Sequence, residues 1–145
     1  MKKRAFAVLA ALAMSGPLMA QDAPETLVTI LTAPEPQTQL MAMVLAMQAA
    51  QQGATPHILL CGPAADIALK EAPASATAPQ APRDMSPQGL MRKIATLPGA
   101  KVEVCAIYLP GKGADASVLL EGVTVAKPKA MAAAMIAPNA RLASY

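Results

Sequence analysis

The stretch Lys101-Val-Glu-Val-Cys-Ala-Ile-Tyr-Leu-Pro110 carries a run of β-branched and large apolar residues between two turn signals. Pro98-Gly99 precedes the run and Pro110-Gly111 closes it, and such pairs mark the ends of strands. The pattern predicts a strand buried in a sheet, with Cys105 at its centre. Free cysteine is among the most buried residue types, so Cys105 is either a packing residue or the first place to look for chemistry.

Strands and helices alternate on both sides of this stretch. Short apolar runs predict strands over residues 25–32, 57–61, 123–125 and 141–145. Helical spacing and capping residues predict helices over residues 37–52, 64–70, 86–97, 115–120 and 128–135. This order indicates an α/β fold with a mostly parallel sheet of five strands and helices on both of its faces.

The helix over residues 37–52 has a wide apolar face, formed by Leu40, Met43, Val44 and Met47 and extended by Met41 and Leu45. Thioethers and thiolates suit Cu(I) in an oxidising compartment, so Met41, Met43 and Met47 raise the alternative of a copper-binding protein. Core packing explains the pair Met43 and Met47 without a metal, because both lie on one side of the helix. Met41 points to another side.

Residues 72–82 read Ala-Pro-Ala-Ser-Ala-Thr-Ala-Pro-Gln-Ala-Pro. A run so rich in alanine and proline supplies little apolar surface for a core. We therefore expect residues 72–87 to form an exposed, mobile loop, after which Ser86 and Pro87 begin the next helix.

The chain begins with Met-Lys-Lys-Arg, a short apolar run and small residues before Gln21. These features are typical of a secretory signal peptide over residues 1–20, and we expect cleavage after Ala20 and export to the periplasm without a membrane anchor. Cleavage removes three basic residues, so the 12 basic and 9 acidic side chains become nine of each. With no net basic charge and no Trp, nucleic-acid binding is excluded.

Cys61 ends the second predicted strand and is the only other cysteine. An oxidising compartment permits one disulfide with Cys105. A sheet order of 2-1-3, however, would separate the two residues by two strand spacings, ~9.6 Å, beyond the ~7 Å that a disulfide spans. We therefore expect no disulfide within the chain, while one between subunits stays open. His57, the only histidine, lies where this strand begins and about 13 Å from Cys61 along it, so no shared metal site is expected.

The segment from Gly99 through Lys-Val-Glu-Val-Cys-Ala106 resembles the cysteine strand of the DsrE/DsrF-like family, which includes TusD and YchN-like proteins. The endings Leu120-Glu-Gly-Val-Thr-Val125 and Ala137-Pro-Asn-Ala-Arg-Leu-Ala-Ser-Tyr145 are similar to the last strands of that family. The resemblance covers residues 26–145. It implies one flavodoxin-like domain over residues 21–145, assembled as a trimer or hexamer.

In sulfur-relay members of this family, the cysteine that matches Cys105 carries sulfur as a persulfide. The resemblance thus implies a sulfur carrier, more than a turnover enzyme, with protein sulfur donors or acceptors as partners and no cofactor. Cys61 is a possible secondary thiol. Glu103 on the same strand would disfavour the Cys105 thiolate, whereas the helix expected after Gly113 would favour it. A binding or assembly module without covalent chemistry stays the alternative.

Overall fold

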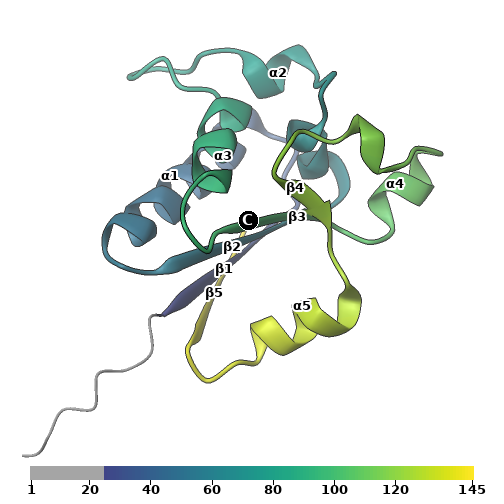
Figure 1. Cartoon of the computed structure of the whole chain (residues 1–145). Helices are drawn as coiled ribbons and strands as arrows, with labels where there is room; N and C mark the ends of the chain where they lie inside the picture. Colours follow the sequence, from purple (N-terminus) through teal and green to yellow (C-terminus); the bar gives the residue numbers. More distant parts are fainter. Residues whose placement is uncertain (1–24) are drawn as a thin grey trace, which may run out of the picture.

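The computed structural model describes residues 25–145, so the expected signal peptide over residues 1–20 and its cleavage after Ala20 lie outside the described residues. The described chain folds into one α/β unit (Figure 1). Its strands are β1 (Thr26–Leu31), β2 (Thr55–Leu60), β3 (Lys101–Val104), β4 (Val123–Val125) and β5 (Ala140–Ser144). All of their pairings are parallel, which confirms the expected α/β class and sheet.

The α-helices are α1 (Pro36–Gln51), α2 (Ala74–Thr77), α3 (Pro87–Ala95), α4 (Tyr108–Gly111) and α5 (Pro128–Met135). Two 3-10 segments, η1 (Gly62–Ala68) and η2 (Ala116–Val118), complete the fold. The start of α3 follows the predicted chemistry: the Ser86 hydroxyl accepts a hydrogen bond from the Gly89 amide at 3.1 Å, and Pro87 occupies the first turn.

The sheet order is β4-β3-β2-β1-β5, so the expected 2-1-3 order is wrong. Strand β2 lies between β1 and β3, and its residues from Pro56 to Leu60 are all buried. A strand covered on both faces in the middle of a parallel sheet needs such a continuous apolar run.

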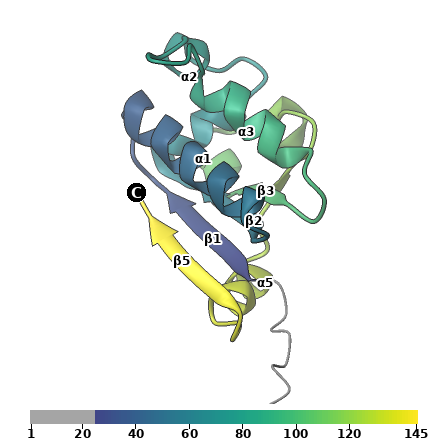
Figure 2. The ribbon, with the colours of Figure 1, turned by 90° about the vertical axis from the view of Figure 1, so that its left-hand side faces the viewer.

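The order of the strands also sets the two layers of helices. The connections β1-α1-β2 and β2-α3-β3 run in one direction across the sheet, and right-handed crossovers then place their helices on one face. The connection β4-α5-β5 returns to the other side of β1, and its helix covers the opposite face. Figure 1 shows α1 and α3 on one side of the sheet and α5 on the other, and Figure 2 shows β5 at the edge beside β1.

The two faces differ in the amount of core they carry. We call them the α1/α3 face and the α5 face. On the α1/α3 face, Leu31, Ile58, Leu60, Val102 and Val104 are at most 1% exposed and join one large cluster with Met43 and Ile94 of the covering helices. The cluster on the α5 face holds only Val28, Leu59, Ala126 and Met131 as buried members.

Three local expectations differ from the structure. The strand expected over residues 101–110 ends at Val104, because its partner β2 ends at Leu60 before Gly62-Pro63 and offers no further pairing. The expected helix over residues 115–120 is reduced to η2. On α1, Met41 and Leu45 do not extend the buried face but are 51% and 44% exposed.

The segment 72–87 is mostly exposed, as expected, but it is not without packing. Ala76 in α2 is buried in the large cluster, and the side chain of Gln80 donates a 3.0 Å hydrogen bond to the Pro36 carbonyl at the start of α1. Within residues 72–82, Ala76 is thus the residue that joins the core, because alanine is small enough for its helix to pack closely.

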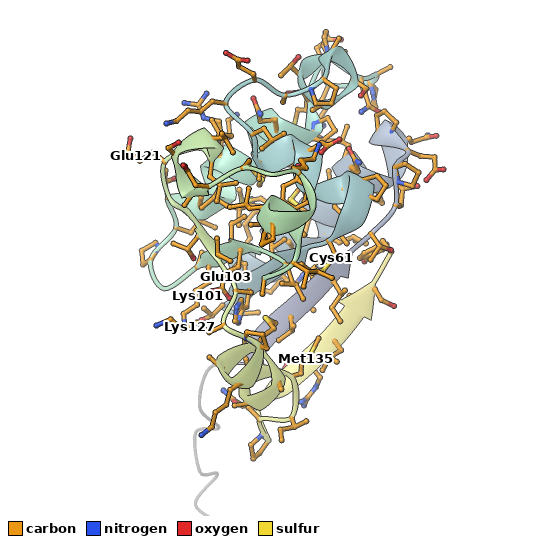
Figure 3. All side chains as sticks on the ribbon, turned by 90° about the vertical axis from the view of Figure 1, so that its right-hand side faces the viewer. Cys61, Lys101, Glu103, Glu121, Lys127 and Met135 are labelled. Atoms are coloured by element: carbon orange, nitrogen blue, oxygen red, sulfur yellow. A yellow bond between two sulfur atoms is a disulfide. The ribbon has the colours of Figure 1, made fainter. Side chains whose placement is uncertain are left out.

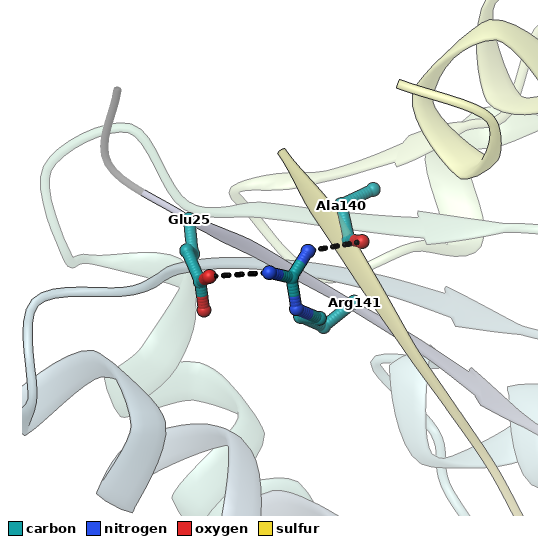
Figure 4. A network of polar contacts seen from close by, with 3 residues as sticks. All are labelled: Glu25, Ala140 and Arg141. Atoms are coloured by element: carbon teal, nitrogen blue, oxygen red, sulfur yellow. Dashed lines mark hydrogen bonds and ion pairs between the residues drawn. The ribbon is translucent and has the colours of Figure 1, made fainter. Parts of the chain in front are cut away.

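The edge strand β5 is tied to the residue before β1. Arg141 donates a hydrogen bond from Nη2 to Glu25 Oε1 at 2.7 Å and another from Nη1 to the Ala140 carbonyl at 3.1 Å (Figure 4). Both partners of the ion pair are more than half exposed, so the pair adds little to stability. Among the helices of residues 25–145, none has the length and apolar character needed to cross a membrane.

Candidate thiol site

Cys61 and Cys105 form a disulfide at the carboxyl end of β2 and β3, with their Cα atoms 5.1 Å apart. The prediction of no disulfide within the chain is therefore wrong. That prediction assumed that β1 separates β2 from β3, whereas the two strands are neighbours. Leu60 pairs with Val104, so Cys61 and Cys105, which follow them, lie side by side. Two cysteines on neighbouring strands at this Cα separation meet the geometric condition for a disulfide.

Backbone hydrogen bonds hold both cysteines in place. The Cys61 amide donates to the Leu31 carbonyl at 2.9 Å, and the Cys105 amide donates to the Leu60 carbonyl at 2.8 Å. The Cys105 carbonyl accepts from the Tyr108 amide at 2.9 Å, which turns the chain into α4. The site therefore lies where the two neighbouring strands β2 and β3 end, and Figure 3 shows Cys61 at that end of the sheet.

Both cysteines are half-buried and line a surface cleft of about 560 Å³. One wall comes from the residues after Cys61 and the other from the residues after Cys105; the lining residues are Gly62, Pro63, Asp66, Ile107, Tyr108, Gly111 and Lys112. Ile107 is 81% exposed and gives the cleft an apolar rim. The disulfide is thus open to a small molecule or to a partner's side chain.

Asp66, Tyr108 and Lys112 form a polar cluster in this cleft. The Tyr108 hydroxyl donates to Asp66 Oδ1 at 2.6 Å, and Lys112 Nζ lies 2.8 Å from the same oxygen. The Lys112 ammonium also lies 5.4 Å from the centre of the Tyr108 ring, within cation–π range. The cluster thus connects η1, in one wall of the cleft, to α4, in the other wall.

The cluster changes two ionisation equilibria. Burial raises the pKa of Asp66, but the hydrogen bonds from Lys112 and Tyr108 and the charge of Lys112 more than offset it, so this pKa lies below its usual value. Burial, together with the hydrogen bond to Asp66 and its charge, raises the pKa of Tyr108 well above its usual value. Asp66 is therefore ionised and Tyr108 neutral at neutral pH, and the Asp66 carboxylate balances the Lys112 ammonium.

A second polar pair lies under the sheet on the α5 face. His57 is the third residue of β2 and only 6% exposed, and its Nε2 lies 2.6 Å from Glu103 Oε2 on β3. Figure 3 shows Glu103 next to Lys101 on that strand. Glu103 is thus engaged by His57, for which the sequence alone predicts only a residue where a strand begins.

The sequence patterns point to both cysteines but not to the polar cluster or to the His57–Glu103 pair. A signal existed for the pair: Glu103 interrupts an apolar strand, a buried carboxylate needs a partner, and His57 is the one histidine in an apolar neighbouring strand. No such signal exists for Asp66, Tyr108 and Lys112, because the apolar run over residues 101–110 predicts a strand where the structure has α4.

The structure also bears on the copper alternative. Met43 is fully buried in the large cluster, whereas Met41 is 51% exposed, so the two do not converge. Across residues 25–145, no group of three His, Cys, Asp or Glu side chains is placed to hold a metal ion.

Comparison with known proteins finds relatives of the fold. The chain matches no protein-family model and no curated protein. Among solved structures it is similar to the ychN protein from E. coli, with a TM-score of 0.64 and 16% identity over 83% of this chain and 99% of that one. It is also similar to MTH1491 from Methanobacterium thermoautotrophicum, described as a protein of unknown function, with a TM-score of 0.59 and 14% identity over 83% and 99% of the two chains. At these identities the likeness shows a shared fold.

Proposed function

We propose that this chain is a periplasmic sulfur-handling protein that carries sulfur as a persulfide on Cys105 when the disulfide with Cys61 is reduced. The observation that carries the proposal is the position of the two cysteines: they meet at the carboxyl edge of the sheet and line an open cleft. Ligands and reacting groups gather at this edge in open α/β sheets. The shared fold with ychN and the resemblance of the Cys105 segment to sulfur-relay proteins add support.

The loading step needs a thiolate and a donor with a sulfane sulfur. The Cys105 thiolate attacks the terminal sulfur of a donor persulfide, a new S–S bond forms at Cys105, and the donor leaves as a thiolate. Sulfur is transferred without net oxidation, so no further reactant is needed. The cleft of about 560 Å³ has room for the incoming group, and the apolar rim at Ile107 suits the approach of a protein donor.

The competing function is a binding module whose disulfide only stabilises the fold. The cleft argues against that alternative: a stabilising disulfide needs no cleft, whereas a disulfide that a reactant can reach is typical of exchange chemistry. A reduced protein that takes up no sulfur would restore this alternative.

Two single-thiol variants test the proposal. Cys61→Ser and Cys105→Ser each lose the disulfide and each keep one thiol, so they are matched in everything except the position of that thiol. After reduction and treatment with inorganic polysulfide, we expect intact-mass spectrometry to show one added sulfur atom on Cys61→Ser and much less on Cys105→Ser. Equal uptake by the two variants would contradict the assignment to Cys105, and uptake by neither would contradict sulfur carrying.

A further inference from the structure

We infer that Cys61 is the resolving thiol of this site: it displaces the sulfur carried on Cys105 as hydrosulfide and leaves the Cys61–Cys105 disulfide as the product. The inference rests on the proposed function and adds what happens to the sulfur after loading. It starts from the disulfide, which demonstrates that Cys61 Sγ reaches Cys105 Sγ without any rearrangement of β2 or β3.

The geometry favours attack inside the chain. The amides of both cysteines are held by ladder hydrogen bonds to Leu31 and Leu60, and the Cα separation of 5.1 Å is that of a bonded pair. A nucleophile held beside its target reacts as if its concentration were many orders of magnitude above that of a free thiol. Cys61 can therefore attack a persulfide on Cys105 before an acceptor arrives from solution.

The step balances in atoms and electrons. The Cys61 thiolate attacks Cys105 Sγ, the bond between Cys105 Sγ and the terminal sulfur breaks, and the terminal sulfur leaves as hydrosulfide with the persulfide proton. The two cysteine sulfurs are oxidised to a disulfide, while the sulfane sulfur is reduced to sulfide. A dithiol, small or on a partner protein, returns the disulfide to two thiols and reaches it through the cleft.

The same step runs in reverse. A hydrosulfide ion that enters the cleft and attacks Cys105 Sγ breaks the disulfide and yields the Cys105 persulfide and the Cys61 thiolate. The oxidised protein is then itself an acceptor of hydrosulfide, with the disulfide supplying the oxidising equivalents. Hydrosulfide and a sulfane-sulfur donor are therefore the two small substrates that the site would take.

The test compares the fate of sulfur on wild type and on Cys61→Ser. Both are reduced, freed of reductant without oxygen, given one equivalent of inorganic polysulfide sulfur, and sampled over time by alkylation and intact mass. We expect wild type to show a transient added sulfur, then to lose two hydrogen masses relative to the reduced protein and release one hydrosulfide per chain. Cys61→Ser should keep its sulfur, with release slower by about ten-fold or more.

The outcomes separate the inference from the proposed function. If Cys61→Ser loads and wild type holds its sulfur just as long without forming the disulfide, the resolving role is overturned while sulfur carrying stands. If Cys61→Ser fails to load, the proposed function itself fails. As a second measurement, the oxidised wild type is treated with hydrosulfide and alkylated: the inference requires persulfide on the Cys105 peptide and a free thiol at Cys61, and the opposite placement overturns it.

Discussion

The two faces of the sheet differ in how much buried apolar core they carry. The α1/α3 face carries a large, closed aliphatic core, with five strand residues at most 1% exposed. The α5 face is covered by one helix of eight residues with a single buried side chain, Met131, and leaves Leu142 of β5 55% exposed. The polar pair His57–Glu103 belongs to this thin face, and both cysteines pack against its small cluster, Cys105 also against the large one.

The proposed thiol chemistry lies beside the face that carries less of the core. A partly buried carboxylate such as Glu103 contributes less to stability than an aliphatic side chain at the same position. A small domain keeps only a narrow margin of stability, so such groups are tolerated where another part of the molecule supplies the core. Here the α1/α3 face supplies it, and the α5 face with its adjoining edge is free to hold the thiol site.

The largest effect that tests this comparison is expected from two matched methionine truncations. Met43→Ala removes a fully buried side chain from the large cluster, and we expect the free energy of unfolding to fall by about 2–5 kcal/mol. Met131→Ala makes the same chemical change under the thin face, where the surrounding cluster of buried residues is smaller, and the loss should lie at the low end of this range, about 2 kcal/mol. Urea unfolding of the two variants measures both values; a larger loss at Met131 would reverse our view of the faces.

The second prediction concerns the disulfide, which links residues 44 positions apart. Reduction of wild type frees the unfolded chain from this loop, and we expect the free energy of unfolding to fall by about 2–4 kcal/mol. Cys61→Ser and Cys105→Ser should be less stable by similar amounts and should not respond to reductant. Unfolding curves that coincide with and without reductant would mean that the bond does not constrain the chain.

The way in which this disulfide escaped prediction shows what local patterns can and cannot resolve. The periodicity of residues 37–52, the cap at Ser86 and the apolar runs around Ile58 and Val102 are local, and they located the starts of these elements to within a few residues. The order of the strands depends on whether the third strand pairs with β1 or with β2. Right-handed crossovers permit both arrangements, and Cys61 lies beside Cys105 only in the second.

One signal in the sequence did favour the observed order. Pro-His-Ile-Leu-Leu in β2 is more continuously apolar than Thr-Leu-Val-Thr-Ile-Leu in β1, and the strand at the centre of a parallel sheet is the one buried on both faces. This contrast favours β2 as the central strand, an order that places Cys61 beside Cys105. The polar cluster at Asp66 had no comparable signal, because its partners follow the third strand, whose end was predicted six residues too late.

The third prediction tests the polar pair on the thin face. Glu103→Ala leaves His57 buried without its partner, and we expect a loss of about 1–3 kcal/mol in the free energy of unfolding. Lys101→Ala, on the same strand and the same face but exposed, is the matched control and should change stability by less than about 0.5 kcal/mol. Equal losses for the two substitutions would show that the His57–Glu103 pair makes no separate contribution to the free energy of unfolding.

The smallest effect is expected from the cluster in the cleft, and it depends on pH. Because the pKa of Asp66 is lower in the folded protein than in the unfolded chain, its contribution to stability is present above the unfolded value of about 3.9 and is lost as the pH falls through the folded one. Tyr108 has the opposite sign: its raised pKa supports the folded state below about 10, and this support is lost at higher pH.

Asp66→Asn separates this contribution from the general loss of stability in acid. Asparagine keeps a carbonyl oxygen for Tyr108 and Lys112 but has no charge to titrate. We therefore expect the variant to be less stable than wild type at pH 7 by no more than about 1 kcal/mol, because both partners of the ion pair are partly exposed. The two proteins should converge as the pH falls through the lowered pKa of Asp66, where its carboxylate loses its charge. Urea midpoints measured across this range decide the point: parallel curves for wild type and variant would show that the charge of Asp66 does not couple the two walls of the cleft.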